Sequence, residues 1–250
     1  MTHPSPATPH RQDHTPNTGT HFLHKEYPKQ FERDQFWQQI KRTVNGQPVS
    51  DADIRMILDQ VTDCLQLNRN DHLLDIGCGN AALSSRLFSA VRSCTGVDFS
   101  SYLLEIARQF FPESQSVRYL EADMRDTDRY FPDAADATKV LLYGCGSYIT
   151  SGELFALLQQ IHSGLPHVRR IMIGNLPDRS KAAEFFQGRG LCNQDLDDSG
   201  SAIGVWWDPT QMATDVRAIG FDFECRRMPM SFYGAKYRFD VLLQRHTARQ

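Results

Sequence analysis

The sequence predicts an α/β domain whose mostly parallel sheet is covered by helices on both faces. Between residues 72 and 175, short apolar runs alternate with helical patterns, and this alternation is typical of a parallel sheet. Three successive apolar runs end in an acid, namely Asp75, Asp98 and Asp123. Because the carboxyl ends of parallel strands meet at one edge of the sheet, we expect these acids to lie together where such sheets bind ligands.

Length and composition indicate a single-domain globular protein. The chain has 250 residues, of which 40% are hydrophobic, so one domain with an appendage is expected. The formal charge of −3 gives no basic surface for nucleic acid, and no apolar run approaches the ~20 residues of a membrane span. Because the N-terminus also lacks the apolar core of a signal peptide, a cytoplasmic location is expected.

The six cysteines are scattered, without a Cys-x-x-Cys pair. This arrangement favours free thiols over a zinc site or a disulfide framework. The acidic cluster between residues 195 and 198 carries no histidine and is interpreted as a solvated loop. No metal is therefore expected.

The N-terminal region has two parts. Residues 1–20 are rich in Pro, Thr and His without an apolar period, so we predict a disordered tail. In residues 21–49 aromatic side chains appear among charged ones, and apolar residues recur every four positions from Phe36 to Val44. This spacing predicts a helix that stops at the following Asn-Gly pair.

Two interpretations of residues 21–49 remain open. The segment is either a helical lid over the ligand, with Tyr27, Trp37 and Arg42 pointing inward, or an appendage that packs on the main domain. Aromatic side chains in a polar segment need a surface to pack on, and both interpretations supply one. The main domain is expected over residues 50–250, starting with a capping box at Ser50.

A glycine turn follows the first expected strand. Residues 73–76 are apolar apart from Asp75, as in a strand buried on both faces. Gly77 and Gly79 admit backbone conformations closed to other residues and let a ligand approach the backbone. Residues 81–91 are then expected to form a helix whose free N–H groups face that ligand.

An acid two positions before the first glycine, Asp75, distinguishes between two kinds of ligand. The spacing of Gly77, Gly79 and Ala82 satisfies the pattern of dinucleotide-binding proteins. However, the carboxylate of Asp75 would repel a pyrophosphate, whereas it suits the ammonium group of S-adenosylmethionine (SAM). Here the sequence resembles the class I SAM-dependent methyltransferases, whose first motif is Asp-x-Gly-x-Gly.

The resemblance covers about residues 50–245 and implies roles for the later strand ends. Asp98 stands about 20 residues after the glycine turn, as expected of a ribose-binding acid. In the family an acid after the third strand contacts the adenine amine and the next side chain packs on the ring; Asp123 and Met124 stand in those places. The cofactor-binding candidates are Asp75, Gly77, Cys78, Gly79, Asp98, Phe99, Asp123, Met124 and Leu142, with Tyr27, Trp37 and Arg42 from the lid.

The second half of the chain completes the expected sheet. The fourth and fifth strand patterns lead to Tyr143 and Asn175 at the ligand edge, and these two residues are the catalytic candidates. The last two strands, at residues 221–226 and 237–243, are joined by too short a connection for a parallel crossover. The resemblance implies a Rossmann-like seven-stranded sheet in the order 3-2-1-4-5-7-6, with strand 7 reversed.

The resemblance implies an enzyme that moves the methyl group of SAM to an O or N nucleophile of a small molecule, leaving S-adenosylhomocysteine (SAH). The slightly acidic charge and the lack of an added nucleic-acid module favour a small acceptor, with neither nucleic acid nor membrane as partner. Neither the acceptor nor the oligomeric state follows from the sequence. Two alternatives stay open, a regulatory protein that binds SAM without turnover and a nicotinamide-dinucleotide-binding protein.

Overall fold

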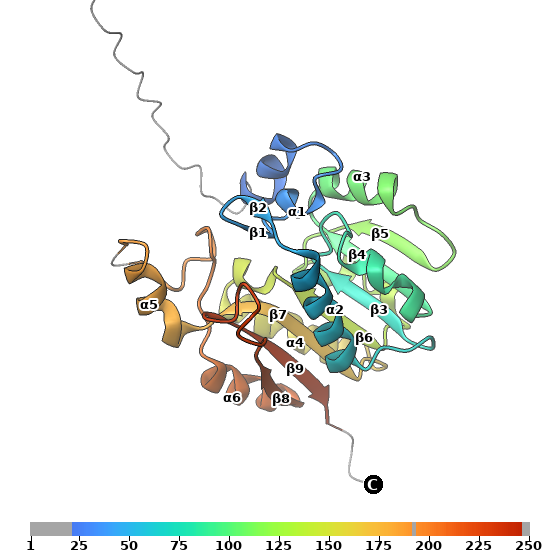
Figure 1. The fold of residues 1–250 in the computed structure, drawn as a ribbon. Helices are drawn as coiled ribbons and strands as arrows, with labels where there is room; N and C mark the ends of the chain where they lie inside the picture. Colours follow the sequence, from blue (N-terminus) through green and yellow to red (C-terminus); the bar gives the residue numbers. More distant parts are fainter. Residues whose placement is uncertain (1–21, 192–193, 247–250) are drawn as a thin grey trace, which may run out of the picture.

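A computed structural model describes residues 22–191 and 194–246 of the chain (Figure 1). Its centre is a seven-stranded sheet with the order β5-β4-β3-β6-β7-β9-β8. All neighbouring strands are parallel except that β9 runs antiparallel to both β7 and β8. The predicted order and the reversed seventh strand are therefore confirmed. The strands are β3 (His72–Ile76), β4 (Ser93–Asp98), β5 (Val117–Glu121), β6 (Lys139–Tyr143), β7 (Arg170–Pro177), β8 (Phe221–Arg226) and β9 (Arg238–Arg245).

Helices cover both faces of this sheet, as predicted. Helices α4 and α6 pack on one face, and α2, η3 and α3 pack on the other. The α-helices in this part of the chain are α2 (Asp51–Leu65), α3 (Ser101–Phe110), α4 (Ser151–Gly164), α5 (Ala182–Gln187) and α6 (Pro209–Ile219). The short 3-10 helices in this part of the chain are η3 (Ser84–Ala90), η4 (Thr127–Arg129), η5 (Pro132–Ala134), η6 (Gly146–Tyr148) and η7 (Arg179–Lys181).

Side-chain oxygens begin these helices where the sequence indicated. The hydroxyl of Ser50 accepts a hydrogen bond from the Asp53 backbone N–H and starts α2. Thr150 and Glu153 form a complete capping box at the start of α4. The Thr150 box holds one end of α4 next to the ligand edge of the sheet.

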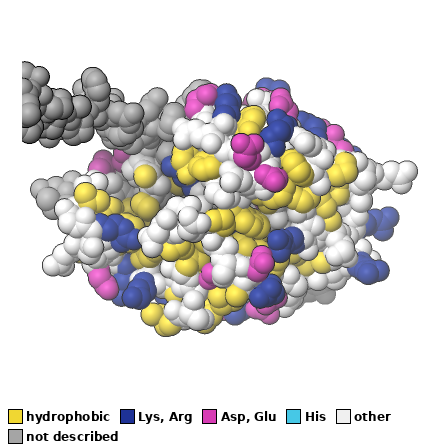
Figure 2. Space-filling view, turned by 45° about the horizontal axis from the view of Figure 1, so that its top comes forward, with side chains coloured by type: hydrophobic (Ala, Val, Ile, Leu, Met, Phe, Trp, Pro, Cys, Tyr) yellow, Lys and Arg dark blue, Asp and Glu magenta, His cyan; other side chains and the backbone are white. Residues whose placement is uncertain are grey.

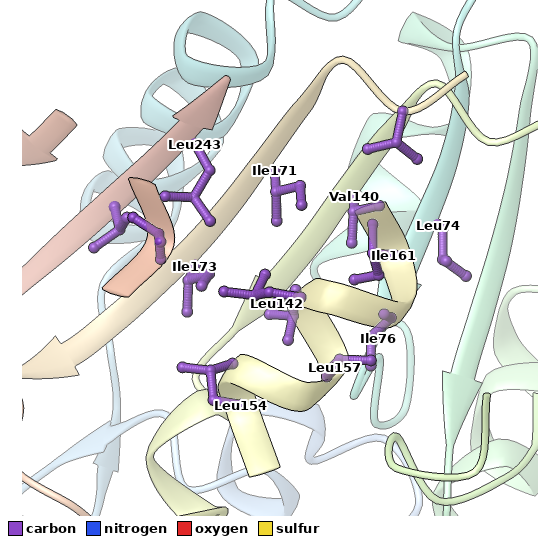
Figure 3. Packing of buried hydrophobic residues seen from close by; sticks show 14 of the residues in the cluster. Leu74, Ile76, Val140, Leu142, Leu154, Leu157, Ile161, Ile171, Ile173 and Leu243 are labelled. Carbon is purple, nitrogen blue, oxygen red and sulfur yellow. The ribbon is translucent and has the colours of Figure 1, made fainter. Parts of the chain in front are cut away.

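The core follows the alternation of each strand. Leu74, Ile76 and Leu142 point toward α4, whose Leu157 and Ile161 pack against them (Figure 3). The intervening strand residues pack with α2 on the opposite face. All five of these side chains are at most 1% exposed, so the strands that carry the site are fixed by a close-packed core that excludes water.

The helix expected over residues 81–91 is wrong in extent. Ala81 takes a positive φ of 57°, which an α-helix does not admit. The loop continues through residues 81–83, and the 3-10 helix η3 begins only at Ser84. The glycine loop is therefore longer than predicted. The backbone N–H groups of residues 77–79 donate to acceptors at the end of β4.

The helix expected around Phe36 is also shorter than predicted. Segment 22–49 consists of η1 (Phe22–Glu26), η2 (Tyr27–Gln30), α1 (Phe36–Gln39) and a hairpin of β1 (Thr43–Val44) and β2 (Gln47–Pro48). Helix α1 ends because Lys41 has a φ of 54°, and the Asn45-Gly46 pair, both with positive φ, forms the hairpin turn. The tail predicted over residues 1–20 lies outside the described residues.

Among residues 22–191 and 194–246, no helix is both long and apolar enough to cross a membrane.

Candidate functional site

A cavity of about 360 Å³ lies at the carboxyl edge of the parallel strands and is covered by segment 22–49. The ends of β3, β4, β5, β6 and β7 all contribute side chains to it. Most of the predicted site residues line this one cavity: Arg42, Asp75, Gly77, Cys78, Gly79, Asp98, Phe99, Asp123, Met124, Tyr143 and Asn175. The structure thus brings together residues that are far apart in the sequence.

The glycine loop has two positions that a side chain would disturb. Gly77 has a φ of 75°, and a Cβ there would lie 2.7 Å from both Cβ and Sγ of Cys145. Gly79 has a φ of 56°, and its Cβ would lie 3.1 Å from Ile40 Cγ2 in the covering segment. Glycine is thus required here by the loop conformation and by protein neighbours, in addition to the expected ligand approach.

Asp98 at the end of β4 fixes the glycine loop. Its carboxylate accepts hydrogen bonds from the backbone N–H of Gly79 at 2.8 Å and of Ser100 at 2.9 Å. Burial raises the pKa of Asp98 to about 6, although these N–H donors oppose the shift. Each carboxylate oxygen has a lone pair left, so a ligand hydroxyl could still donate to it.

Asp75 lies deeper in the same part of the cavity. It is 4% exposed, and burial raises its pKa to about 7, with the nearby charge of Asp98 adding to the shift. Two buried carboxylates side by side are unfavourable when both are ionised. A ligand that brings a positive charge or hydrogen-bond donors would relieve this cost.

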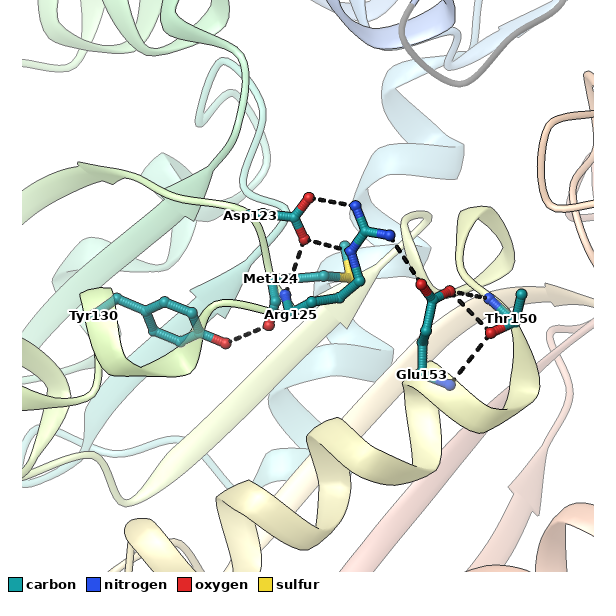
Figure 4. A network of polar contacts seen from close by, with 6 residues as sticks. All are labelled: Asp123, Met124, Arg125, Tyr130, Thr150 and Glu153. Carbon is teal, nitrogen blue, oxygen red and sulfur yellow. Dashed lines mark hydrogen bonds and ion pairs between the residues drawn. The ribbon is translucent and has the colours of Figure 1, made fainter.

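Asp123 follows β5 and is held by an arginine. Both of its carboxylate oxygens accept hydrogen bonds from the guanidinium of Arg125, at 2.6 and 2.8 Å (Figure 4). The same guanidinium donates to Glu153 at 2.8 Å, and so connects the site to the capping box of α4. Hydrogen bonding and charge from Arg125 lower the pKa of Asp123. Beside it, Met124 lines the cavity, and its carbonyl accepts a hydrogen bond from Tyr130.

One buried amide attaches the covering segment to the glycine loop. Asn80 Nδ2 donates to the carbonyl of Phe36 at 2.9 Å and to Oε1 of Gln39 at 2.8 Å. The ring of Phe36 packs edge-on to that of Phe110 in α3. Segment 22–49 is therefore packed on the domain and also forms a wall of the cavity, so the two interpretations of its role are compatible.

Several polar atoms at the cavity are buried without a partner among the described residues. They are His24 Nε2, Arg42 Nη1, Tyr143 Oη and Asn175 Oδ1. The guanidinium of Arg42 lies 4.8 Å from the centre of the Tyr143 ring, and Arg42 is only 7% exposed. Because buried polar atoms are nearly always hydrogen-bonded, these four indicate where a polar ligand is accommodated.

Three candidates lie outside the cavity lining. Tyr27 packs against Phe31 and lies beneath the ammonium group of Lys41. Trp37 packs against the buried cluster on the α2 face, and its ring lies 5.9 Å from the guanidinium of Arg42 and 5.7 Å from that of Arg86. Their inward orientation is therefore not observed, because neighbouring cations bind both rings.

Leu142 is the third candidate outside the lining. Its side chain is fully buried on the α4 face of the sheet. In strand β6 successive side chains alternate, so Leu142 points into the core.

The cavity also contains side chains that the sequence did not indicate. His24 comes from η1, and Tyr148 follows the β6 loop. Tyr233, Tyr237 and Arg238 come from the β8–β9 connection and the start of β9. For Tyr233, Tyr237 and Arg238, the one usable indication in the sequence is the predicted reversal of the last strand. That reversal brings the start of the strand to the ligand edge of the sheet.

Neither the thiols nor a metal cluster offers reactive chemistry at this site. Burial raises the pKa values of Cys78 and Cys145 above the ordinary thiol range, so both remain protonated. In the described part of the chain, no three His, Cys, Asp or Glu side chains gather into a group that could hold a metal ion.

Comparison with known proteins decides between the possible ligands of such a cavity. Residues 73–166, from β3 to the end of α4, match the sequence model of a methyltransferase domain. These residues carry a methyltransferase domain, and the comparisons support a class I SAM-dependent methyltransferase family for the chain. The family match includes the Asp75-x-Gly-x-Gly turn and both later strand-end acids.

Solved structures and curated relatives agree with this family. Magnesium protoporphyrin IX methyltransferase from Synechocystis PCC 6803, solved with SAH bound, has the same fold, with a TM-score of 0.60 and 16% identity over 90% of this chain and 97% of that one. YqeM of Bacillus subtilis, assigned provisionally to the methyltransferases, is 27% identical over 141 residues, which are 56% of each chain. Ribosomal RNA small subunit methyltransferase A of Chlorobium phaeobacteroides is 33% identical over 103 residues, 41% of this chain and 37% of the relative. The chain thus spans about half or less of the length of these curated relatives.

The cavity has side chains suited to the cofactor of this family. SAM carries ribose hydroxyls, an ammonium group and a carboxylate. Asp98 and Asp75 are buried acids with acceptor capacity for the first two, and Arg42 has an unpartnered guanidinium nitrogen for the third. The donor and acceptor types present therefore fit SAM.

Proposed function

We propose that this methyltransferase binds SAM in the cavity and transfers its methyl group to an oxygen or nitrogen nucleophile of a small molecule, releasing SAH. The observation that carries the proposal is the gathering of Asp75, Asp98 and Asp123 around one cavity that also holds the unpartnered Arg42. This charge arrangement is opposite to that needed by the pyrophosphate of a nicotinamide dinucleotide.

Each cofactor contact is assigned to a residue with matching chemistry. Asp98 is assigned to the ribose hydroxyls, because a carboxylate accepts both more strongly than a neutral side chain does. Asp123 and Met124 are assigned to the adenine. Asp75 is assigned to the ammonium group and Arg42 to the carboxylate, so that each charge of the cofactor's amino-acid end has a partner of opposite sign.

When bound, SAM supplies an electrophilic methyl group on a sulfonium, and the electron pair of the broken S–C bond stays on sulfur. The protein's part is to align the acceptor and to exclude water. Tyr143 is fitted to orient an acceptor rather than to deprotonate it, because burial raises its pKa well above the usual range and keeps its hydroxyl protonated. Asn175, with an unpartnered Oδ1, is fitted to accept a hydrogen bond from the acceptor.

His24 does not serve as a general base in this proposal. Burial, with the nearby charge of Lys41, lowers its pKa to about 4, so the imidazole is neutral and weakly basic at pH 7. An amine or an acidic oxygen needs little help from a base. Its proton can leave to solvent after transfer.

A small acceptor is favoured over RNA, although one curated relative is a ribosomal RNA methyltransferase. The cavity lies beneath segment 22–49 and has a volume of about 360 Å³, which is in the range of small-molecule sites. The formal charge is −3, and charges of both signs are interspersed on the face shown in Figure 2. An RNA-binding face would instead concentrate Lys and Arg.

Calorimetry with SAM, SAH and NADH tests the cofactor assignment directly. We expect SAM and SAH to bind with micromolar dissociation constants, and NADH not to bind. Binding of NADH without SAM or SAH would overturn the assignment.

A transfer assay with methyl-labelled SAM tests the acceptor class. Panels of phenols, amines and carboxylic acids are compared with ribosomal RNA. Label entering only RNA would contradict the small acceptor, and tight SAM binding without transfer to any class would favour the regulatory alternative.

A further inference from the structure

The cavity has a second cationic group at the end opposite to its acids. Arg238 is the first residue of β9, and its side chain lines the cavity. The acids belong to the ends of β3, β4 and β5, whereas β9 lies three strands beyond β3 in the sheet. At a spacing of about 4.8 Å per strand, the backbone of Arg238 is roughly 14 Å from the β3 end and farther from β4. None of these three acids forms an ion pair with Arg238 in the described part of the chain.

Unlike several other arginines of this chain, Arg238 forms no ion pair with a carboxylate among the described residues. Arg125, Arg179 and Arg227 each form an ion pair with a carboxylate. In the described part of the chain no carboxylate lies within ion-pair distance of Arg238. Its Nη1 donates to the carbonyl of Asn175, and its side chain is also hydrogen-bonded to Tyr237. A guanidinium has five N–H donors, so these two neutral partners leave donors for a ligand and do not balance the charge.

The nearest buried acid does not change this balance. Asp240 follows Arg238 by two positions, is 3% exposed and does not line the cavity. Its oxygens already accept hydrogen bonds from the Asn175 backbone N–H at 2.6 Å and from Gln60 at 3.0 Å. Burial raises the pKa of Asp240, although the nearby charges of Arg238 and Arg42 oppose the shift. Asp240 attracts Arg238 but forms no ion pair with it among the described residues, and of the two only Arg238 lines the cavity.

Phenol groups surround this guanidinium. Tyr148, Tyr233 and Tyr237 line the same end of the cavity, and the Arg238 guanidinium lies 5.0 Å from the centre of the Tyr237 ring. Burial raises the pKa values of Tyr148 and Tyr233, so these hydroxyls remain hydrogen-bond donors. A guanidinium with neighbouring hydroxyl donors is suited to a planar oxyanion.

Arg42 and Arg238 approach the cavity from different elements, and both side chains reach the neighbourhood of Asn175 at β7. Arg42 Nη2 lies 3.5 Å from the point where a Cβ on Gly144 would stand, beyond the end of β6 and next to the cofactor loop at β3. Arg238 lies two strands farther along, past β7. The cofactor has one carboxylate, which Arg42 is placed to bind, so Arg238 is left for a second anion.

We propose that Arg238 binds a carboxylate of the methyl acceptor, so that the substrates of this enzyme are small organic acids. This inference rests on the proposed function and names the substrate class of the same site. Tyr233 and Tyr237 add hydroxyl donors to the bound carboxylate. Arg238 selects and orients the acceptor, and the methyl group goes to a nucleophile elsewhere on it or on the carboxylate itself.

Matched acids and amides test the proposal on the wild-type protein saturated with SAH. The probes are benzoate, 4-hydroxybenzoate and phenylacetate, each paired with its neutral amide, and the measurements are calorimetry and the shift in melting temperature. We expect at least one carboxylate to bind tenfold or more tightly than its amide. Equal affinity or absence of binding for every pair would overturn the proposal.

The variant Arg238→Gln then locates the effect. We expect it to lose at least tenfold of the carboxylate affinity, while its dissociation constant for SAH stays within twofold of the wild type. Arg169→Gln is the matched control, because it removes the same charge from an exposed position at the opposite edge of the sheet. An equal loss in both variants, or a loss of SAH binding in Arg238→Gln, would contradict the assignment of Arg238 to the acceptor.

A lysine variant and the SAH-binding measurement separate loss of the anion site from misfolding and from failure of the proposed function. Arg238→Lys retains the charge and should keep part of the carboxylate affinity even if Arg238→Gln folds poorly; a lysine variant no better than the glutamine variant in folded protein counts against an anion site. If SAH does not bind the wild type, the proposed function fails. Carboxylate binding that still depends on Arg238 would then support the anion site alone.

Discussion

Replacement of Asp98 by alanine should abolish most cofactor affinity without unfolding the protein. The carboxylate is assigned to two ribose hydroxyls, and a hydrogen bond to a charged group contributes about 1.5–3 kcal/mol. We therefore expect SAM and SAH binding to weaken by ~2–4 kcal/mol, which is roughly a 30- to 1,000-fold increase in dissociation constant.

The stability of the Asp98→Ala variant is set by two effects of opposite sign. With a folded-state pKa of about 6 against an ordinary 3.8, the ionised carboxylate costs roughly 3 kcal/mol at pH 7.5, and alanine removes that cost. However, the N–H groups of Gly79 and Ser100 lose their acceptor, at about 1–3 kcal/mol each. The net change runs from about +1 to −3 kcal/mol, so the melting temperature should fall by no more than roughly 10 °C and the protein should stay folded.

Calorimetry with SAH and a thermal melt on the same preparation measure both quantities. Asp98→Asn is the companion variant, because it keeps the size of the side chain but removes its charge, and it should also lose affinity. A folded Asp98→Ala protein that binds SAH within threefold of the wild type would refute the role given to this residue.

Three further variants or conditions test other parts of the site. Asp123→Ala should weaken SAH binding less than Asp98→Ala does, because Asp123 is half-buried and already paired with Arg125; an equal or larger loss, measured by calorimetry, would contradict this ranking. Trp37→Ala should raise the dissociation constant for SAH by releasing Arg42, which packs on its ring, and a destabilised variant with unchanged affinity would show that the segment only packs. Burial raises the pKa of Asp98 to about 6 and that of Asp75 to about 7. Between about pH 4 and 7 the folded protein therefore binds more protons than the unfolded chain. The stability of the free protein should fall as pH rises through this window. SAH affinity should rise over the same window, because the ligand needs the ionised acids; a flat binding profile between pH 5.5 and 8 would count against this assignment.

The part of the site predicted from sequence is the part built by local patterns. Asp75, Asp98 and Asp123 each follow an apolar run directly, and the parallel arrangement of the strands then brings them to one edge. Leu142 does not line the cavity, because side chains alternate along β6: Leu142 points into the core and Tyr143 to the opposite face. This alternation is a local pattern and can be recognised in the sequence.

The remaining residues depend on contacts between distant segments. Trp37 packs against the core cluster on the α2 face and near Arg86, which lies beyond the glycine loop in the sequence. Arg238 reaches the cavity because β9 runs antiparallel to its neighbours. The short connection before β9 predicted that reversal, but nothing local showed that the side chain of Arg238 would lack an acidic partner.

Asn80 makes the glycine loop and the covering segment one cooperative unit. Its side chain is fully buried, and its amide bonds reach Phe36 and Gln39 while its own oxygen accepts from Ala82. If the segment lifted, this amide would lose both protein acceptors, so opening of the segment is penalised and coupled to the glycine loop. A ligand that orders the loop therefore also raises the free energy needed to expose residues 36–39, and the fluctuations of the two stretches become correlated without any direct contact between the ligand and those residues' backbone.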